Sequence, residues 1–244
     1  MARLSGKARI QLVPWDVNSA DHQSRLFQQR VACGFGTEAV ELWTAECKAG
    51  TMAMYWITLA DDCPNRAEYL AAHMENYPED AIPLADTAST IFKNPRLPPT
   101  VEFFPVGHVG LADRPEKIAK VGLPPDIPIS WLTGIYTSWV LQGVGIGYAA
   151  MQIAEKTAKD IGTSKGQGRV TMVLDTITVS FQFDETYKRL YYEERGLEVP
   201  KISLQQWYEK QGYVQFHDDP EGNTWTKGET TLTVPLVYYK KLLH

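Results

Sequence analysis

A glycine-rich loop separates a long apolar run from a regular helical pattern near the middle of the chain. The run is Ile129–Leu141, the loop is Gln142–Gly147, and apolar residues then recur at spacings of three and four up to Ile161. This order predicts a buried strand, a tight loop and a helix. The first amides of a helix lack intrahelical acceptors, and glycines let a ligand come close to the backbone. The loop is therefore a candidate anion-binding site.

The chain after this predicted helix completes a strand, helix and strand unit. A loop at Gly162–Gly168 leads into a predicted strand at Arg169–Val179. Two strands that are joined by a helical crossover run parallel in the same sheet. We therefore expect Ile129–Leu141 and Arg169–Val179 to be parallel neighbours.

The remaining elements are predicted from hydrophobic periodicity and from cap and turn residues. Most of the prolines fall between Pro78 and Pro128, which predicts a loop-rich middle region. Residues Asp184–Glu198 are highly charged and are expected to form a solvated helix or an excursion. Helices are expected at Ala20–Val31 (capped by Asn18 or Ser19), Glu38–Cys47 (capped by Thr37), Ala67–Met74 and Leu204–Gln211. Strands are expected at Arg9–Val13, Met52–Leu59, Val101–Leu111 with an interruption at Pro105, Tyr213–Phe216 and Thr230–Tyr239.

Composition and charge argue against several classes of protein. With 244 residues, of which 44% are hydrophobic, the chain can bury an ordinary apolar core. Its net charge of -5 and its scattered basic residues argue against nucleic acid and membrane as partners. The chain has no apolar run of transmembrane length, and Met1–Val13 is a short basic opening rather than a signal peptide. The three cysteines fit neither a disulfide framework nor a zinc site, so we expect a cytoplasmic protein without a bound metal.

The glycine loop taken alone also fits a dinucleotide-binding fingerprint. Gly145, Gly147 and Ala150 match its loose form, and Asp175 ends the next predicted strand. The acidic residue, however, follows the glycines by about 30 residues, where the fingerprint needs about 20. Too few residues remain for a full doubly wound sheet, so this interpretation is disfavoured.

Two motifs in a fixed order favour another interpretation. The first is Gln142-x-x-Gly145-x-Gly147, and the second is the run Trp207–Tyr213, which reads Trp-Tyr-Glu-Lys-Gln-Gly-Tyr. Together they resemble the GNAT superfamily of acyl-CoA-dependent N-acyltransferases. The resemblance covers 129–168 and 204 to the C-terminus, and the second motif is similar to branches that are common in filamentous fungi.

The resemblance implies an α/β fold with a mixed, mostly antiparallel sheet, splayed at the cofactor strand and flanked by helices. It implies that residues 1–244 form a single domain with a cofactor-binding core at 129–168 and insertions near 64–100 and 179–202. The co-substrate would be acetyl-CoA, with its pantetheine on the backbone of the cofactor strand and its pyrophosphate on the loop amides. Gln142 stands where the family more often has arginine. The implied cofactor-binding residues are Ile135, Tyr136, Thr137, Gln142, Gly143, Val144, Gly145, Ile146 and Gly147.

The resemblance also implies which groups carry the chemistry. Tyr208 matches the family tyrosine that protonates the leaving thiolate, and a phenol with an ordinary pKa of about 10 keeps its proton at neutral pH. Some family members place a glutamate base where this chain has Trp131, and the predicted cofactor strand contains no acidic residue. Glu102 and His108, expected on one face of the neighbouring strand, are candidate proton acceptors, and Asp175 is a third. The alternative is that these side chains are structural and that water carries the proton.

The resemblance implies an acetyl-CoA-dependent N-acetyltransferase that acts on a small primary amine by direct attack in a ternary complex. The alternative from another class is a domain that binds acyl-CoA without catalysis, as a sensor or an interaction module. We expect a monomer or a homodimer. Aromatic residues beside acids in 179–202 predict a lid over a compact or aromatic amine.

Overall fold

The computed structural model describes residues 8–244, so the beginning of the predicted basic opening, residues 1–7, lies outside the described residues. The chain divides into two compact units. Unit 1 contains the residues up to Asp113 together with Leu132–Ile161, and unit 2 contains Arg114–Trp131 and Gly162–His244. Strand β8 (Ile129–Thr137) passes from unit 2 into unit 1 and is therefore part of both.

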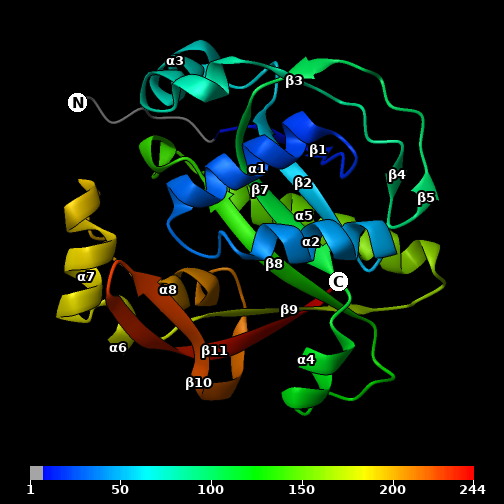
Figure 1. Cartoon of the computed structure of the whole chain (residues 1–244). Helices are drawn as coiled ribbons and strands as arrows, with labels where there is room; N and C mark the ends of the chain where they lie inside the picture. Colours follow the sequence, from blue (N-terminus) through cyan, green and yellow to red (C-terminus); the bar gives the residue numbers. More distant parts are fainter. Residues whose placement is uncertain (1–7) are drawn as a thin grey trace. The chain divides into compact units, whose positions relative to one another are not determined.

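Unit 1 contributes β1, β2, β7 and its part of β8 to the large sheet, and helices cover both faces of these strands. Figure 1 shows α1 and α2 on one face and α5 on the other. Two short two-stranded sheets lie in the segment between α3 and β7. The elements are β1 (Ile10–Pro14), α1 (Ala20–Cys33), α2 (Ala39–Ala49), β2 (Met52–Leu59), α3 (Arg66–Asn76), the 3-10 helix η1 (Pro78–Ala81), β3 (Leu84–Ala85), β4 (Thr90–Ile91), β5 (Asn94–Pro95), β6 (Glu102–Phe103), β7 (Pro105–Ala112), the 3-10 helix η2 (Trp139–Leu141) and α5 (Ile146–Ser164), which extends past the end of the unit.

Unit 2 is built on a long C-terminal hairpin. Its two strands have 14 residues each, and β11 also pairs antiparallel with β9. The elements are α4 (Pro115–Lys120), the beginning of β8, β9 (Val170–Ile177), α6 (Val179–Gln182), α7 (Glu185–Tyr191), the 3-10 helix η3 (Glu193–Arg195), α8 (Leu204–Glu209), β10 (Val214–Lys227) and β11 (Thr230–Leu243).

Seven of the strands form one mixed sheet in the order β1-β2-β7-β8-β9-β11-β10. β2 pairs antiparallel with β1 and with β7. β8 and β9 run parallel, with register pairs from Ile129↔Thr171 to Trp131↔Val173, and α5 lies between them in the chain. The mixed sheet and the parallel pair that were predicted from the sequence are therefore confirmed.

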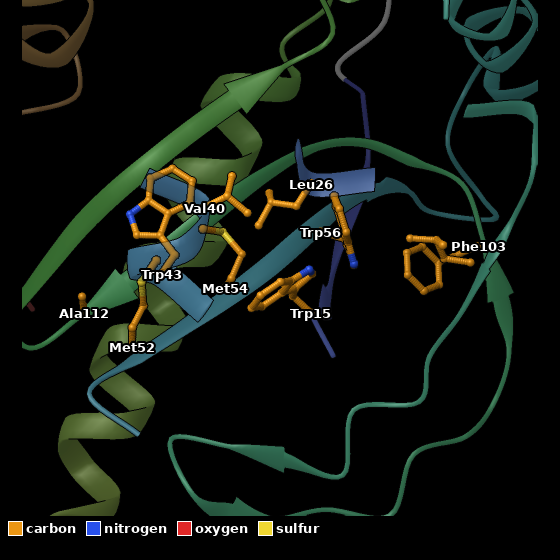
Figure 2. Close-up of a cluster of buried hydrophobic side chains, with 10 residues drawn as sticks. Trp15, Leu26, Val40, Trp43, Met52, Met54, Trp56, Phe103 and Ala112 are labelled. Carbon is orange, nitrogen blue, oxygen red and sulfur yellow. The ribbon is translucent and has the colours of Figure 1, made fainter. Parts of the chain in front are cut away.

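An aromatic and methionine-rich cluster forms the core of unit 1 (Figure 2). All eight residues of β2 are buried, which is the burial of a central strand with both faces covered. Helices α1 and α2 contribute side chains from one stripe each, as expected for amphipathic helices. The cluster consists of Trp15, Leu26, Val40, Trp43, Met52, Met54, Trp56, Leu84, Phe103 and Ala112.

Three predicted features are corrected by the structure. The predicted strand Ile129–Leu141 ends at Thr137, and its last apolar residues form η2 instead. The predicted cap Thr37 is replaced by Glu38 at the N-cap of α2, without a side-chain cap hydrogen bond. The predicted strand Tyr213–Phe216 is the beginning of the much longer β10, because irregular pairing lets the turn-like residues after it remain in the strand.

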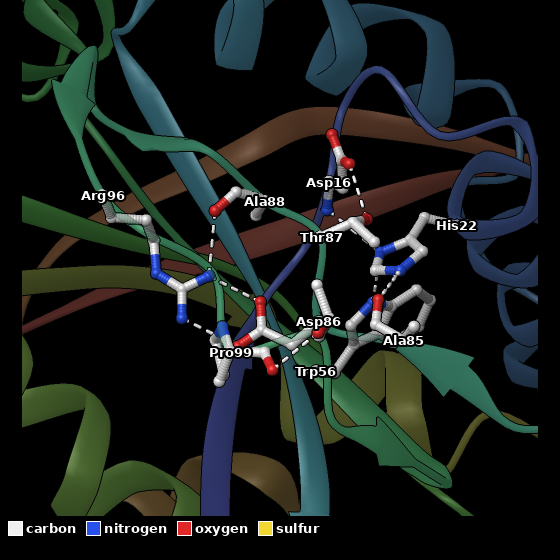
Figure 3. Close-up of polar contacts among 10 residues, drawn as sticks. Asp16, His22, Trp56, Ala85, Asp86, Thr87, Ala88, Arg96 and Pro99 are labelled. Atoms are coloured by element: carbon white, nitrogen blue, oxygen red, sulfur yellow. Dashed lines mark hydrogen bonds and ion pairs between the residues drawn. The ribbon is translucent and has the colours of Figure 1, made fainter.

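Polar contacts hold the first part of the predicted loop-rich region, up to Asp113, against the rest of unit 1 (Figure 3). The two terminal guanidinium nitrogens of Arg96, Nη1 and Nη2, donate to the carboxylate of Asp86 at 2.5 and 2.7 Å. Nδ1 of His22 accepts from the backbone amide of Asp16 at 3.0 Å and from the indole of Trp56 at 3.1 Å, which leaves Nε2 to donate to the Ala85 carbonyl at 3.0 Å. Burial lowers the pKa of His22 and favours this neutral form.

The charged excursion in unit 2 is built around buried aromatic rings. The rings of Tyr187 and Tyr191 are stacked at 4.9 Å, and both contact Trp225 on β10. Tyr192 is also buried. These rings form part of the unit 2 core and do not give the excursion an exposed aromatic face.

Candidate functional site

The second half of β8 has an irregular backbone that is fixed from one side. Gly134 has a φ of 59°, a left-handed conformation inside a strand. A Cβ atom at this glycine would lie 2.6 Å from Cη2 of Trp43. Ile135 and Thr137 are partly exposed, whereas Tyr136 is buried. The strand therefore presents its predicted cofactor-binding residues on two different faces.

The backbone of β7 comes very close to the end of β8. A Cβ atom at Gly107 would lie 2.2 Å from the carbonyl oxygen of Tyr136, so only glycine permits this approach. The amide of Ser138 donates to the Val106 carbonyl at 2.8 Å. Thr137, between these two contacts, is thus held at a fixed position relative to β7.

The glycine loop connects η2 to a helix of 19 residues. Gly143 and Gly145 have φ values of 83° and 90°, which other L-residues rarely adopt. A Cβ atom at Gly143 would meet no heavy atom within 4 Å, so the loop backbone is accessible. Ala149 donates to the Gly145 carbonyl at 3.0 Å and closes the first turn of α5. The free amides of this turn suit an anion such as a pyrophosphate.

Tyr208 lies on α8, a short helix in unit 2. A capping box between Ser203 and Gln206 begins this helix. The Tyr208 side chain is buried against the rings of Trp207 and Tyr213. Burial raises the pKa of Tyr208, and the negative charge of Asp175 raises it further. The phenol therefore retains its proton at neutral pH, as a proton donor must.

Asp175 receives two donors within unit 2. The indole nitrogen of Trp131 donates to Oδ1 of Asp175 at 3.0 Å, and Nζ of Lys117 donates to the same oxygen at 3.2 Å. The Lys117 ammonium also lies 5.2 Å from the centre of the Trp131 ring. The side chain of Asp175 is 18% exposed, so solvent reaches it. A carboxylate and an aromatic ring together hold an ammonium group at this position.

The other two candidate proton acceptors are not on one strand, in contrast to the prediction. Glu102 is exposed and lies on β6, paired with Ala85 of β3, whereas His108 lies on β7. The chain passes from one sheet to another at Phe104, one residue before the predicted interruption. His108 is fully buried, with Nδ1 at 2.9 Å from Oε1 of Gln29. Burial, and secondarily the positive charge of Arg30, lowers the pKa of His108 well below its ordinary value.

The predicted residues thus fall into two groups that the structure describes separately. The part of β8 from Leu132 onward and the glycine loop belong to unit 1, and Tyr208 belongs to unit 2 together with Asp175 and Trp131. Sequence reasoning missed the link between Trp131 and Asp175, for which the parallel pairing of their strands is the available signal. Between residues 8 and 244, no cluster of three or more His, Cys, Asp or Glu side chains is arranged to hold a metal ion. Within the same range, none of the helices has the length and apolar character needed to cross a membrane.

Comparison with known proteins gives matches among solved structures. No family model matches the chain, and no curated protein matches it. One similar structure is an aminoglycoside 6'-N-acetyltransferase complexed with coenzyme A, at 13% identity and a TM-score of 0.49, covering 96% of this chain and 97% of that chain. Another is the aminoglycoside 6'-N-acetyltransferase from Enterococcus faecium, at 13% identity and a TM-score of 0.48, with the same coverage. A third is an acetyltransferase of the GNAT family from Staphylococcus aureus, at 8% identity and a TM-score of 0.44, covering 96% of this chain and 99% of that chain.

Proposed function

We propose that this chain is a GNAT-family enzyme that transfers an acetyl group from acetyl-CoA to a small primary amine by direct attack in a ternary complex. The observation that carries the proposal is the glycine loop of the motif Gln142-x-x-Gly145-x-Gly147, located between η2 and the first turn of α5. Because β8 belongs to both units, residues 1–244 act as a single domain in this proposal. The second motif, which contains Tyr208, supplies an independent sequence match.

In the proposed complex, the two ends of the CoA molecule bind to different backbone groups. The pyrophosphate accepts hydrogen bonds from the amides of Gly143–Gly147, where accessible glycines leave room for it. The pantetheine adds to Ile135–Thr137 through backbone hydrogen bonds, as an extra strand does at a sheet edge. Gln142 is exposed and supplies a neutral side-chain donor to the phosphates.

The proposed reaction needs one proton acceptor and one proton donor. The lone pair of the neutral amine attacks the thioester carbonyl carbon, the C–N bond forms, and collapse of the intermediate breaks the C–S bond. Tyr208 protonates the departing thiolate. Among the candidate acceptors we assign the proton to Asp175, whose carboxylate is partly exposed and belongs to the same unit as Tyr208. The substrate ammonium then takes the place of the Lys117 ammonium, because a carboxylate paired with a lysine is a weaker base. Glu102 and His108 then have structural roles, and His108 is fully enclosed.

Thiol release in the presence of acetyl-CoA and a panel of amines tests this proposal. We expect at least one amine to raise thiol release above hydrolysis and to gain an acetyl group, detected by mass spectrometry. Protein that binds CoA in calorimetry but transfers nothing to any amine would favour the alternative, a non-catalytic acyl-CoA sensor or interaction domain. Protein that does not bind CoA would contradict both.

A further inference from the structure

A chain of buried polar side chains leads from α1 to the end of β8. Oγ of Ser138 lies 2.9 Å from Nδ1 of His73 on α3. Nε2 of His73 lies 2.9 Å from Oδ2 of Asp80 on η1. The other carboxylate oxygen, Oδ1, lies 3.0 Å from Nε of Arg25 on α1. All four side chains are buried within unit 1.

The inner members of this chain are close together without directed hydrogen bonds between them. The contacts of Asp80 with His73 and Arg25 are at ion-pair distance, but they lack hydrogen-bond geometry. Burying a guanidinium and a carboxylate has a large desolvation cost, and apolar side chains of the same size would fill the space without it. Arg25 also donates to the carbonyls of Glu79 and Ile82 at 2.6 and 3.0 Å, which fixes both ends of η1. These contacts therefore fix the position of η1 relative to α1 more than they increase the stability of the fold.

The same segment also contacts the residue on the other side of Thr137. The hydroxyl groups of Tyr136 and Tyr77 are hydrogen-bonded, and the Tyr77 ring lies 5.3 Å from the ring of His73. Tyr136 and Ser138 are both buried, whereas Thr137 between them is partly exposed. The α3–η1 segment thus holds the two neighbours of Thr137 and leaves Thr137 itself accessible.

Ser138 also connects the end of the strand to the beginning of the loop. Its amide donates to Val106 on β7, and its carbonyl accepts from the amide of Leu141 at 3.0 Å, the last residue of η2. A serine beside a histidine can form a nucleophile and base pair, but the Ser138 side chain is 0% exposed, so no substrate reaches its oxygen. Its hydroxyl instead has one partner of fixed location, His73.

We propose that His73 is a positioning residue for cofactor binding, which acts through Ser138 on the backbone of Thr137 and on the start of the glycine loop. The inference rests on the proposed function, in which Thr137 binds pantetheine. It assigns a role to the first predicted insertion, since α3 and η1 both lie in 64–100. Backbone recognition depends on placement within a fraction of an ångström, so loss of the anchor weakens cofactor binding without touching the reacting groups.

Four variants test this proposal. Ser138→Ala removes the hydroxyl, and His73→Gln retains a polar group near the Nε2 position, which faces Asp80, but none at the Nδ1 position. His73→Asn does the reverse and retains a partner for Ser138. Val40→Ala, in the core of the same unit, is the control for a loss of stability alone.

We expect Ser138→Ala and His73→Gln to raise the KM for acetyl-CoA about tenfold, with kcat and the amine KM nearly unchanged. His73→Asn should recover most of that affinity. Hydrogen exchange in the ligand-free protein should accelerate at the amides of Ser138 and Leu141 in the first two variants only. This second measurement needs no cofactor.

The possible results separate this inference from the proposed function. An acetyl-CoA KM and an exchange pattern in Ser138→Ala and His73→Gln that equal those of Val40→Ala would overturn the positioning role. Equal losses in His73→Asn and His73→Gln would also overturn it, because the Ser138 contact would then be irrelevant. Faster exchange in the first two variants, in a protein whose parent form does not bind CoA, would support the anchor and refute the proposed function.

Discussion

A negative charge in the glycine loop should weaken CoA binding, and Gly145 is the best position at which to test this. Gly145 is exposed, has a φ of 90°, and a Cβ atom there would lie 4.0 Å from its nearest neighbour, the amide nitrogen of Ala8. Gly145→Asp therefore adds a charge without a steric clash inside the protein. Gly145→Asn adds a side chain of the same shape, and both Asn and Asp tolerate a left-handed backbone better than other residues.

The expected loss of CoA affinity is the difference between Gly145→Asp and Gly145→Asn. Each variant has the same backbone strain, about 1–2 kcal/mol, which should lower the Tm by about 2–8 °C. Two unit charges about 4 Å apart repel by about 1 kcal/mol in bulk water and about 4 kcal/mol near a protein surface. Because about 1.4 kcal/mol corresponds to tenfold in affinity, Gly145→Asp should bind CoA about 5- to 1,000-fold more weakly than Gly145→Asn.

Calorimetric titration of the parent and both variants with CoA measures this difference. The difference between Asp and Asn should shrink as salt is added, since the screening length falls from about 10 Å at 0.1 M to about 3 Å at 1 M. Pantetheine, which lacks the pyrophosphate, should bind to all three proteins equally. Thermal unfolding of each protein checks that all three are folded.

Two results would contradict this prediction. If folded Gly145→Asp bound CoA with the same Kd as Gly145→Asn at low salt, the pyrophosphate would not lie on this loop. If CoA and pantetheine were weakened equally, the charge would be acting through a change in the fold rather than through the phosphate.

Three further predictions address the other named residues. Tyr208→Phe should retain CoA affinity and lower kcat by about 100- to 1,000-fold in thiol-release assays, and an unchanged kcat would leave the phenol with a packing role. Gly107→Ala should lower the free energy of unfolding by about 1–3 kcal/mol, because its Cβ would lie 2.2 Å from the Tyr136 carbonyl oxygen; an unchanged Tm would contradict that close approach. Burial lowers the pKa of His108, so the unfolded chain binds more protons below about pH 6.5, and the stability present above that pH is lost as the pH falls. In denaturant titrations, His108→Gln should reduce the slope of the free energy of unfolding against pH by up to about 1.4 kcal/mol per pH unit. An unchanged slope would contradict this prediction.

The elements with a regular apolar period are the ones that the sequence predicts well. The predicted strand Met52–Leu59 has the bounds of β2, and the predicted helix Ala67–Met74 lies within α3. The end of β8 could not be located in this way. Trp139–Leu141 continues the apolar run, and an apolar run alone does not distinguish a strand from a 3-10 turn.

The candidate site is predictable only where it is local in the sequence. The glycine motif is a continuous stretch, and its helix is a direct consequence of the pattern that follows. The buried contact between His73 and Ser138 joins residues 65 positions apart, and no spacing rule relates them. Glu102 and His108 are close in the sequence, but the chain passes from one sheet to another between them. This change could not be predicted, because a two-residue strand such as β6 is too short to show a hydrophobic pattern.

The proposed proton acceptor, Asp175, lies on a different strand from the residue that it contacts. The cofactor strand contains Trp131 where an acid was sought, and Trp131 is in register with Val173 of β9. Two residues further along β9, on the same face as Val173, is Asp175, whose carboxylate accepts from the Trp131 indole. The Asp175 carboxylate therefore lies on the strand next to β8, diagonally opposite Trp131, the position at which a glutamate was expected. The contact between Asp175 and β8 depends on the register between β8 and β9, which is known only from the folded structure.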